Sequence, residues 1–190
     1  KAGFGFERAK WVQENSYNFS YNQYGFILDG LATVLKPDER WSRAMAGPHH
    51  NVMLHLFNSQ NTFKLSKSVL KLSVGAQSNK REEDEGGGQI SLNMHLLSLL
   101  QSLRWEKDLS RSISFVASQQ FTYENNTNYG KRILVPDANF MEGNLSGYLK
   151  GLFGKFTVEL GAGISDKNIR TFKTNNLNPP GSPVAPFTKN

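Results

Sequence analysis

The stretch FTVELGAGI, residues 156–164, alternates an apolar residue with a polar residue or glycine along its whole length. A period of two gives a β-strand one apolar and one polar face. The same alternation recurs in four further stretches, which are NSYNFSYNQ (15–23), SVLKLSVGAQS (68–78), SISFVASQQFTYE (112–124) and NLSGYLKGLF (144–153). The chain is therefore predicted to be all-β.

About eight strands are expected from this pattern. Their approximate limits are 2–9, 14–27, 49–62, 67–80, 93–105, 112–124, 140–152 and 156–170. One stretch, MHLLSLLQSL (94–103), is apolar enough for a helix, but it is short, lacks a capping residue and lies between strand patterns, so it is interpreted as a strand. The expected fold is an antiparallel up-and-down meander of long strands.

The connections between the expected strands alternate in length. Those near 9–13, 63–67, 106–111 and 152–155 are short, whereas those near 28–48, 81–92 and 125–139 are long, and the tail from 171 behaves like a fourth long connection. All short turns then fall at one end of the sheet and all long loops at the other. This arrangement is typical of outer-membrane β-barrels, whose strands need about 9–11 residues to cross the bilayer.

Aromatic residues accompany the short turns. Trp11, Trp105, Phe153 and Phe156 each lie beside one of them. Aromatic side chains at this level suit a girdle at a membrane interface, with ordinary packing at strand ends as the alternative. The charged stretch KREEDEGGG (80–88) is interpreted as an exposed external loop tip. Polar residues that alternate with the apolar ones are expected to line a polar lumen; these include Lys71, Ser73, Gln77 and Glu159.

Composition excludes several classes of function. The net charge is +6, but the 22 Lys and Arg residues are dispersed, whereas a nucleic-acid-binding surface needs a basic stripe. The chain has no cysteine, so it has neither disulfides nor cysteine metal sites. No apolar run approaches the roughly 20 residues of a transmembrane helix.

Four stretches carry a resemblance to a known family. YNQYGFILDG (21–30), PHHNVMLHL (48–56), LSVGAQSNKREEDE (72–85) and NTNYGKRILVPDANFMEGNLSGYLKGLFGKFTVELGAGISDK (126–167) resemble, in order and spacing, strand and loop elements of TonB-dependent outer-membrane receptors of the Bacteroidetes type. The last of them includes a hairpin with a Gly-Lys turn. The sequence departs from the family pattern at Asn139 and Phe140, where an aromatic residue follows the aspartate more directly in the family.

The resemblance implies active import across the outer membrane. A receptor of this family binds a scarce solute, such as a siderophore, metal complex or cofactor, and opens through the TonB complex. Its barrel has about 22 strands and an N-terminal plug. Residues 1–190 are then expected to be a barrel segment of a larger receptor, without the plug domain and the C-terminal strands. The partners implied are outer-membrane lipid, a small solute and TonB, and no enzymatic activity or bound cofactor is expected.

Two other classes of protein are compatible with eight strands. One is a complete small outer-membrane barrel that acts as an adhesin or structural anchor. The other is a soluble lipocalin-like carrier. In both, strand 2–9 would pair with strand 156–170, whereas in a receptor segment these two edges would pair with other parts of a larger barrel.

Candidate site residues are confined to the expected external loops. Lys131 and Arg132 are candidates for contact with an anionic ligand, and Glu82 and Glu83 for contact with a ligand or cation, although a solvated surface is the simpler interpretation for both pairs. His49 and His50 point to opposite faces of a strand, so they cannot jointly bind one metal ion. His49, Met53 and His55 would share a face, but no metal site is predicted, and no catalytic motif is present.

Overall fold

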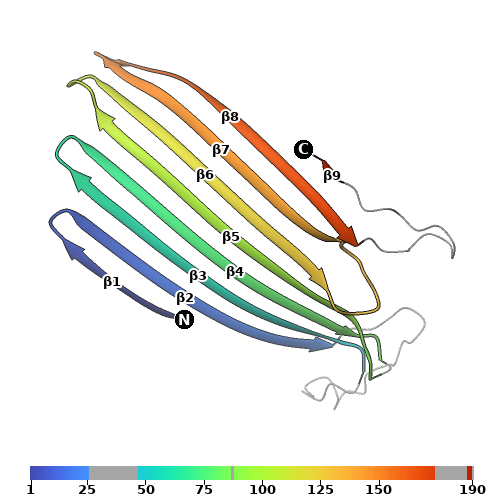
Figure 1. Ribbon diagram of the computed structural model, residues 1–190. Coiled ribbons are helices and arrows are strands. Elements are labelled where there is room, and N and C mark those ends of the chain that lie inside the picture. Colours follow the sequence, from blue (N-terminus) through green and yellow to red (C-terminus); the bar gives the residue numbers. More distant parts are fainter. Residues whose placement is uncertain (26–46, 87, 174–187, 190) are drawn as a thin grey trace.

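The computed structural model describes residues 1–25, 47–86, 88–173 and 188–189. In these ranges the chain forms one antiparallel sheet whose strand order follows the sequence (Figure 1). The strands are β1 (Ala2–Arg8), β2 (Trp11–Gly25), β3 (His49–Leu65), β4 (Ser68–Asp84), β5 (Ile90–Asp108), β6 (Ile113–Asn128), β7 (Asp137–Phe153), β8 (Phe156–Lys173) and β9 (Thr188–Lys189). The predicted all-β meander is confirmed. The described residues include no helix long and apolar enough to cross a membrane.

The strands are longer than the sequence pattern indicated. β2 to β8 have 15 to 19 residues each, because several continue beyond the apolar alternation into polar sequence. The ambiguous stretch 94–103 lies inside β5, which confirms its interpretation as a strand.

The connections are sorted by length, as expected. Residues 9–10, 66–67, 109–112 and 154–155 form the short turns, which lie together at one end of the sheet, here named the short-turn end (Figure 1). The ends of β2, β4 and β6 and the starts of β3, β5 and β7 lie at the opposite end, here named the long-loop end, and the connections between them span 26–48, 85–89 and 129–136 in the sequence. The expected loop 81–92 is wrong in extent, since only five residues separate β4 from β5. Most of the expected connection 28–48, the end of the strand expected at 14–27 and the Pro-rich stretch 178–186 lie outside the described residues.

The register gives the sheet two chemically different faces. The face that carries Leu70, Leu72, Val74 and Ala76 of β4, with their cross-strand partners, is named the apolar face. It carries most of the exposed large hydrophobic side chains, which include Tyr17, Phe19, Phe57, Leu99, Phe121, Leu145, Leu149, Leu160 and Ile164. The opposite, polar face carries Lys71, Ser73, Gln77 and Glu159, as the alternation predicted.

An aromatic row crosses the apolar face near the short-turn end. The ring of Trp11 lies 4.5 Å from that of Phe6, edge to face, and 5.6 Å from that of Phe63, stacked. Trp105 of β5 lies 6.0 Å from Phe115 of β6. Phe153 and Phe156 are register partners across the last short turn. The expected alignment of aromatic residues beside the short turns is thus present in the sheet.

Polar residues interrupt the apolar face on β2 and β3. Trp11 Nε1 donates to Asn61 Oδ1 at 3.2 Å, and Asn61 Nδ2 donates to Ser59 Oγ at 3.1 Å. Gln13 Nε2 donates to Asn15 Oδ1 at 3.4 Å. These groups bond mainly to one another, which lowers the cost of placing them on an apolar surface.

The sheet is open. Among the described strands, β1 pairs only with β2, while β8 pairs with β7 and over two residues with β9. β1 and β8 therefore lie at opposite sides of the sheet (Figure 1). The pairing of strand 2–9 with strand 156–170, which both the small-barrel and the lipocalin-like interpretations require, is not formed in the described part of the chain.

Candidate functional site

The acidic stretch after Lys80 belongs to a strand rather than to a loop tip. Glu83 pairs with His50 of β3 and Leu92 of β5, and a register shift follows at Asp84. Glu83 and Asp84 are only 7% and 6% exposed, so the expectation that this stretch lies in open solvent is wrong. Pairing on both sides and a folded neighbouring loop bury the two carboxylates.

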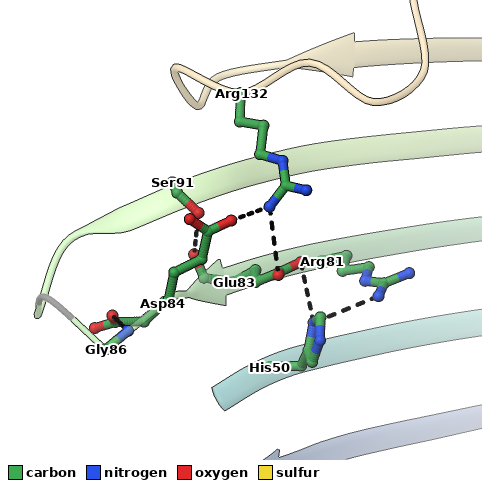
Figure 2. A network of polar contacts seen from close by, with 8 residues as sticks. His50, Arg81, Glu83, Asp84, Gly86, Ser91 and Arg132 are labelled. Atoms are coloured by element: carbon green, nitrogen blue, oxygen red, sulfur yellow. Dashed lines mark hydrogen bonds and ion pairs between the residues drawn. The ribbon is translucent and has the colours of Figure 1, made fainter. Parts of the chain in front are cut away.

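A network of charged side chains lies on the polar face at the long-loop end (Figure 2). His50 Nδ1 lies 3.6 Å from Glu83 Oε2 and 3.4 Å from Arg81 Nη2. Arg132, from the connection 129–136, reaches back over β5 to contact Glu85 and, at 3.8 Å, Glu83 Oε1. The network thus joins β3 and β4 to a loop residue that lies 47 positions after Glu85 in the sequence.

Asp84 organises the turn between β4 and β5. Its Oδ1 atom accepts the backbone N–H groups of Gly86 at 2.7 Å and Gly88 at 3.2 Å. Both glycines have a positive φ, 100° and 69°, which other residues adopt only with strain. The two N–H groups already have an acceptor in the chain, so this glycine-rich turn has no cradle for phosphate there.

The connection 129–136 is fastened to β5. The backbone N–H groups of Tyr129 and Arg132 donate to the carbonyl oxygens of Asn93 at 2.7 Å and Ser91 at 2.9 Å. Gly130 lies so close to β5 that a Cβ atom there would be 2.6 Å from its backbone. Only glycine allows this approach.

Apolar and amide contacts complete the attachment of this loop. Leu92 of β5 is fully buried, and Ile133 of the loop is 5% exposed, which makes them a small core at the long-loop end. Asn128 Nδ2 donates to the carbonyl oxygen of Val135 at 2.8 Å, and the Asn128 N–H donates to Asp137 Oδ1 at 2.7 Å. The loop therefore has a defined conformation before any ligand binds.

Burial lowers the pKa of one member of the network, His50. Removal of His50 from water lowers its pKa below the ordinary value; the carboxylate of Glu83 opposes this shift, and the positive charges of Arg81 and His49 add to it. Neutral His50 is therefore favoured beside the guanidinium of Arg81.

The four predicted ligand-binding residues are not gathered in one site. Glu83 and Arg132 meet within the network. Glu82 lies on the apolar face, where its Oε1 atom is 2.7 Å from Lys80 Nζ. Lys131 is exposed and has no side-chain partner among the described residues. Because Arg132 already faces two carboxylates, an anionic ligand would have to compete with them.

Sequence reasoning missed His50 and Glu85 as members of the network. The position of His50 opposite Glu83 depends on the register of β3 against β4, which the alternation alone does not provide. The sequence did indicate part of the network, because Arg81 and Glu83 are two residues apart and therefore share a face of any strand.

The histidines on the apolar face have protein partners. His55 Nδ1 lies 2.7 Å from Tyr17 Oη, and His95 Nε2 lies 2.7 Å from Ser78 Oγ. His49, Met53 and His55 share this face, as the sequence predicted. Within the described ranges there is no group of three or more His, Asp or Glu side chains that could hold a metal ion.

A second charged network lies on the polar face near the short-turn end. Glu106 Oε1 lies 3.0 Å from Lys71 Nζ and 2.7 Å from Arg104 Nε. Arg104 Nη2 donates to Tyr148 Oη at 2.9 Å, and Lys150 Nζ lies 3.1 Å from Glu159 Oε1. The cations of this network are thus matched by carboxylates or a phenol.

Comparison with known proteins finds no family model, curated protein or solved structure that matches this chain.

Proposed function

We propose that the chain forms part of the barrel wall of an outer-membrane active transporter, a TonB-dependent receptor without enzymatic chemistry. The observation that carries the proposal is the combination of an apolar, exposed face with long strands whose connections are sorted by length. On this proposal the apolar face contacts lipid and the polar face lines the lumen.

The dimensions of the apolar face support this arrangement. On β4 and β5 the apolar face carries no charged side chain between the aromatic row, at Leu70 and Trp105, and Lys80 with its partner His95. Ten residues of strand extend about 33 Å. At a tilt of about 40° they span about 25 Å, the height of the apolar band of an outer-membrane barrel.

The distribution of polar groups also supports a membrane wall. Aromatic side chains border the band at the short-turn end, and charged side chains begin at its long-loop end. On the polar face, every strand from β2 to β8 carries hydroxyl, amide or charged side chains, while β3 and β5 also place Leu54, Leu56, Leu96 and Leu100 there. Such a face suits a water-filled lumen and would be costly against lipid.

The open sheet agrees with a segment of a barrel larger than eight strands. The family assignment rests on the resemblance of four stretches, and the imported ligand belongs to the general class of scarce solutes such as siderophores, metal complexes or cofactors. The long-loop end, with its prefolded 129–136 connection, is then the external side where such a solute is first bound.

Two measurements on the natural gene product test the proposal. An antibody against this segment should detect, in outer-membrane fractions, a band several times the 21.3 kDa of the chain. Deletion of the gene should abolish energy-dependent uptake of one labelled solute, and an uncoupler should have the same effect on the wild type. A band near 21 kDa, or a product found only in soluble fractions, would contradict it.

A further inference from the structure

A hollow with both polar and apolar lining lies on the apolar face, at the long-loop edge of the charge-free band. Its volume is about 530 Å³, and its lining is Met53, His55, Ser78, Lys80, Asn93, His95 and Tyr129. The register places the β3, β4 and β5 members of this set on the apolar face, so the hollow does not open to the polar face. If the apolar face contacts lipid, as proposed above, this hollow lies at the level of the lipid headgroups.

We infer that the hollow binds the phosphate-bearing headgroup of a membrane lipid. The inference rests on the proposed membrane function. Six of the hollow's seven lining residues carry a polar group, while most of the exposed lining surface is apolar, so the hollow suits the junction between a headgroup and its acyl chains. A headgroup can lie in the hollow while its acyl chains run along the apolar residues below, such as Leu97 and Leu99 of β5.

The ammonium group of Lys80, the cation in the hollow, can donate a hydrogen bond to a second acceptor. Lys80 Nζ lies 2.7 Å from Glu82 Oε1, and its side chain is 42% exposed. An ammonium group has three N–H donors, so the contact with Glu82 leaves donors for a phosphate oxygen. The carboxylate of Glu82 offsets part of the positive charge, so a phosphate bound here also needs hydrogen bonds from neutral donors.

The two imidazoles supply further polar contacts. His55 uses Nδ1 toward Tyr17, and His95 uses Nε2 toward Ser78. Each ring therefore retains one nitrogen for a ligand, and neighbouring protein groups hold each ring in place. Ser78 lies beside His55 in the register and bonds to His95, so the two rings border the same hollow.

The test uses the full-length protein folded in detergent micelles. Binding of a short-chain phosphatidic acid is titrated for wild type, Lys80→Gln and His95→Gln. Lys167→Gln is the matched control, since Lys167 lies near the long-loop end but on the polar face, 4.0 Å from Glu142. We expect affinity to fall about tenfold in Lys80→Gln, as for loss of one charged hydrogen bond, and to stay unchanged in Lys167→Gln.

Several outcomes would overturn the inference. Equal affinity in wild type and Lys80→Gln, an equal loss in Lys167→Gln, or equally tight binding of inorganic phosphate would each do so. The heat-dependent shift in gel mobility of folded barrels shows that each variant is folded. A protein that fails to insert into bilayers contradicts the proposed function itself. A protein that inserts but binds phosphatidic acid without Lys80 contradicts only the headgroup site.

Discussion

Arg104 on β5 and Tyr148 on β7 are joined by a hydrogen bond of 2.9 Å that crosses the intervening strand β6. The guanidinium carbon also lies 5.9 Å from the centre of the tyrosine ring. Tyr148 is the register partner of Val116, which is 5% exposed, so the bridge helps to cover an apolar residue on the polar face. A bridge between second-neighbour strands resists bending of the sheet at β6.

Removal of the phenol oxygen should therefore weaken this part of the sheet. We expect Tyr148→Phe to lower the free energy of unfolding by about 0.5–1.5 kcal/mol, because the hydrogen bond is lost while the ring remains. Denaturant titration followed by tryptophan fluorescence measures the change. Tyr123→Phe is the control, since its hydroxyl group makes only a 3.4 Å contact with Asn139, and a larger effect there would contradict the role of the bridge.

Truncation of Leu92 should loosen the 129–136 connection. Leu92 is fully buried next to this loop, and such a truncation costs about 2–5 kcal/mol through lost contacts and a cavity. We expect Leu92→Ala to expose the loop to limited proteolysis. Leu99→Ala, at a position that is 42% exposed on the apolar face, should leave the cleavage rate in this loop unchanged.

The two carboxylates that face Arg132 should differ in their contribution to stability. The side chain of Glu83 is 10% exposed and that of Glu85 is 39% exposed. Glu83→Gln should cost about 1–3 kcal/mol, because it removes the charge of a nearly buried carboxylate that faces Arg132, and Glu85→Gln less than about 1 kcal/mol because solvent screens it. Equal losses in urea titration would show that Glu83 is not held as the network describes.

The lowered pKa of His50 predicts a pH dependence of stability. The folded protein binds fewer protons at this site than the unfolded chain, so stability rises with pH between the lowered pKa and the ordinary value of about 6.5. Below the lowered pKa both states are protonated, and above about 6.5 both are neutral, so the contribution levels off. Unfolding midpoints across this window should show a smaller slope in His50→Gln than in wild type. Identical slopes would contradict the prediction.

Adjacent residues of β4 provide a test of the two faces. Val74 lies in the middle of the charge-free band, and Ser73 lies beside it on the polar face. Val74→Lys should cost about 2–4 kcal/mol on insertion into lipid vesicles, since it places a charge near the bilayer centre. Ser73→Lys should insert as wild type does. If both lysines are tolerated equally, the apolar face does not contact lipid.

The sequence predicted the strands well where alternation is strong. β8 and the centre of β4 were identified because apolar residues alternate with polar residues or glycine there, and β6 because its residues mostly alternate. It failed at residues 81–84, where four charged residues in succession resemble a loop. They extend a strand because the neighbouring strands, His50 and Arg132 supply partners that no local pattern reveals.

The candidate site was less predictable than the fold. Arg132 and Glu83 were both identified as candidates, but their contact depends on how the 129–136 loop folds back across β5. Gly130, which permits the close approach, is an ordinary loop glycine in the sequence. Glu82 was grouped with Glu83 by adjacency, although consecutive strand residues face opposite sides of a sheet.

Every long ladder of the sheet joins strands that are consecutive in the chain, and this affects how the protein folds. Four hairpins close through connections of two to four residues, so their formation requires little loop-closure entropy. Such hairpins can form early, and the edge strands of neighbouring hairpins can then pair with one another. The connection 26–48 is the longest between consecutive strands from β1 to β8, so the ladder between β2 and β3 should form among the last. Changes in that connection should slow folding more than they reduce final stability.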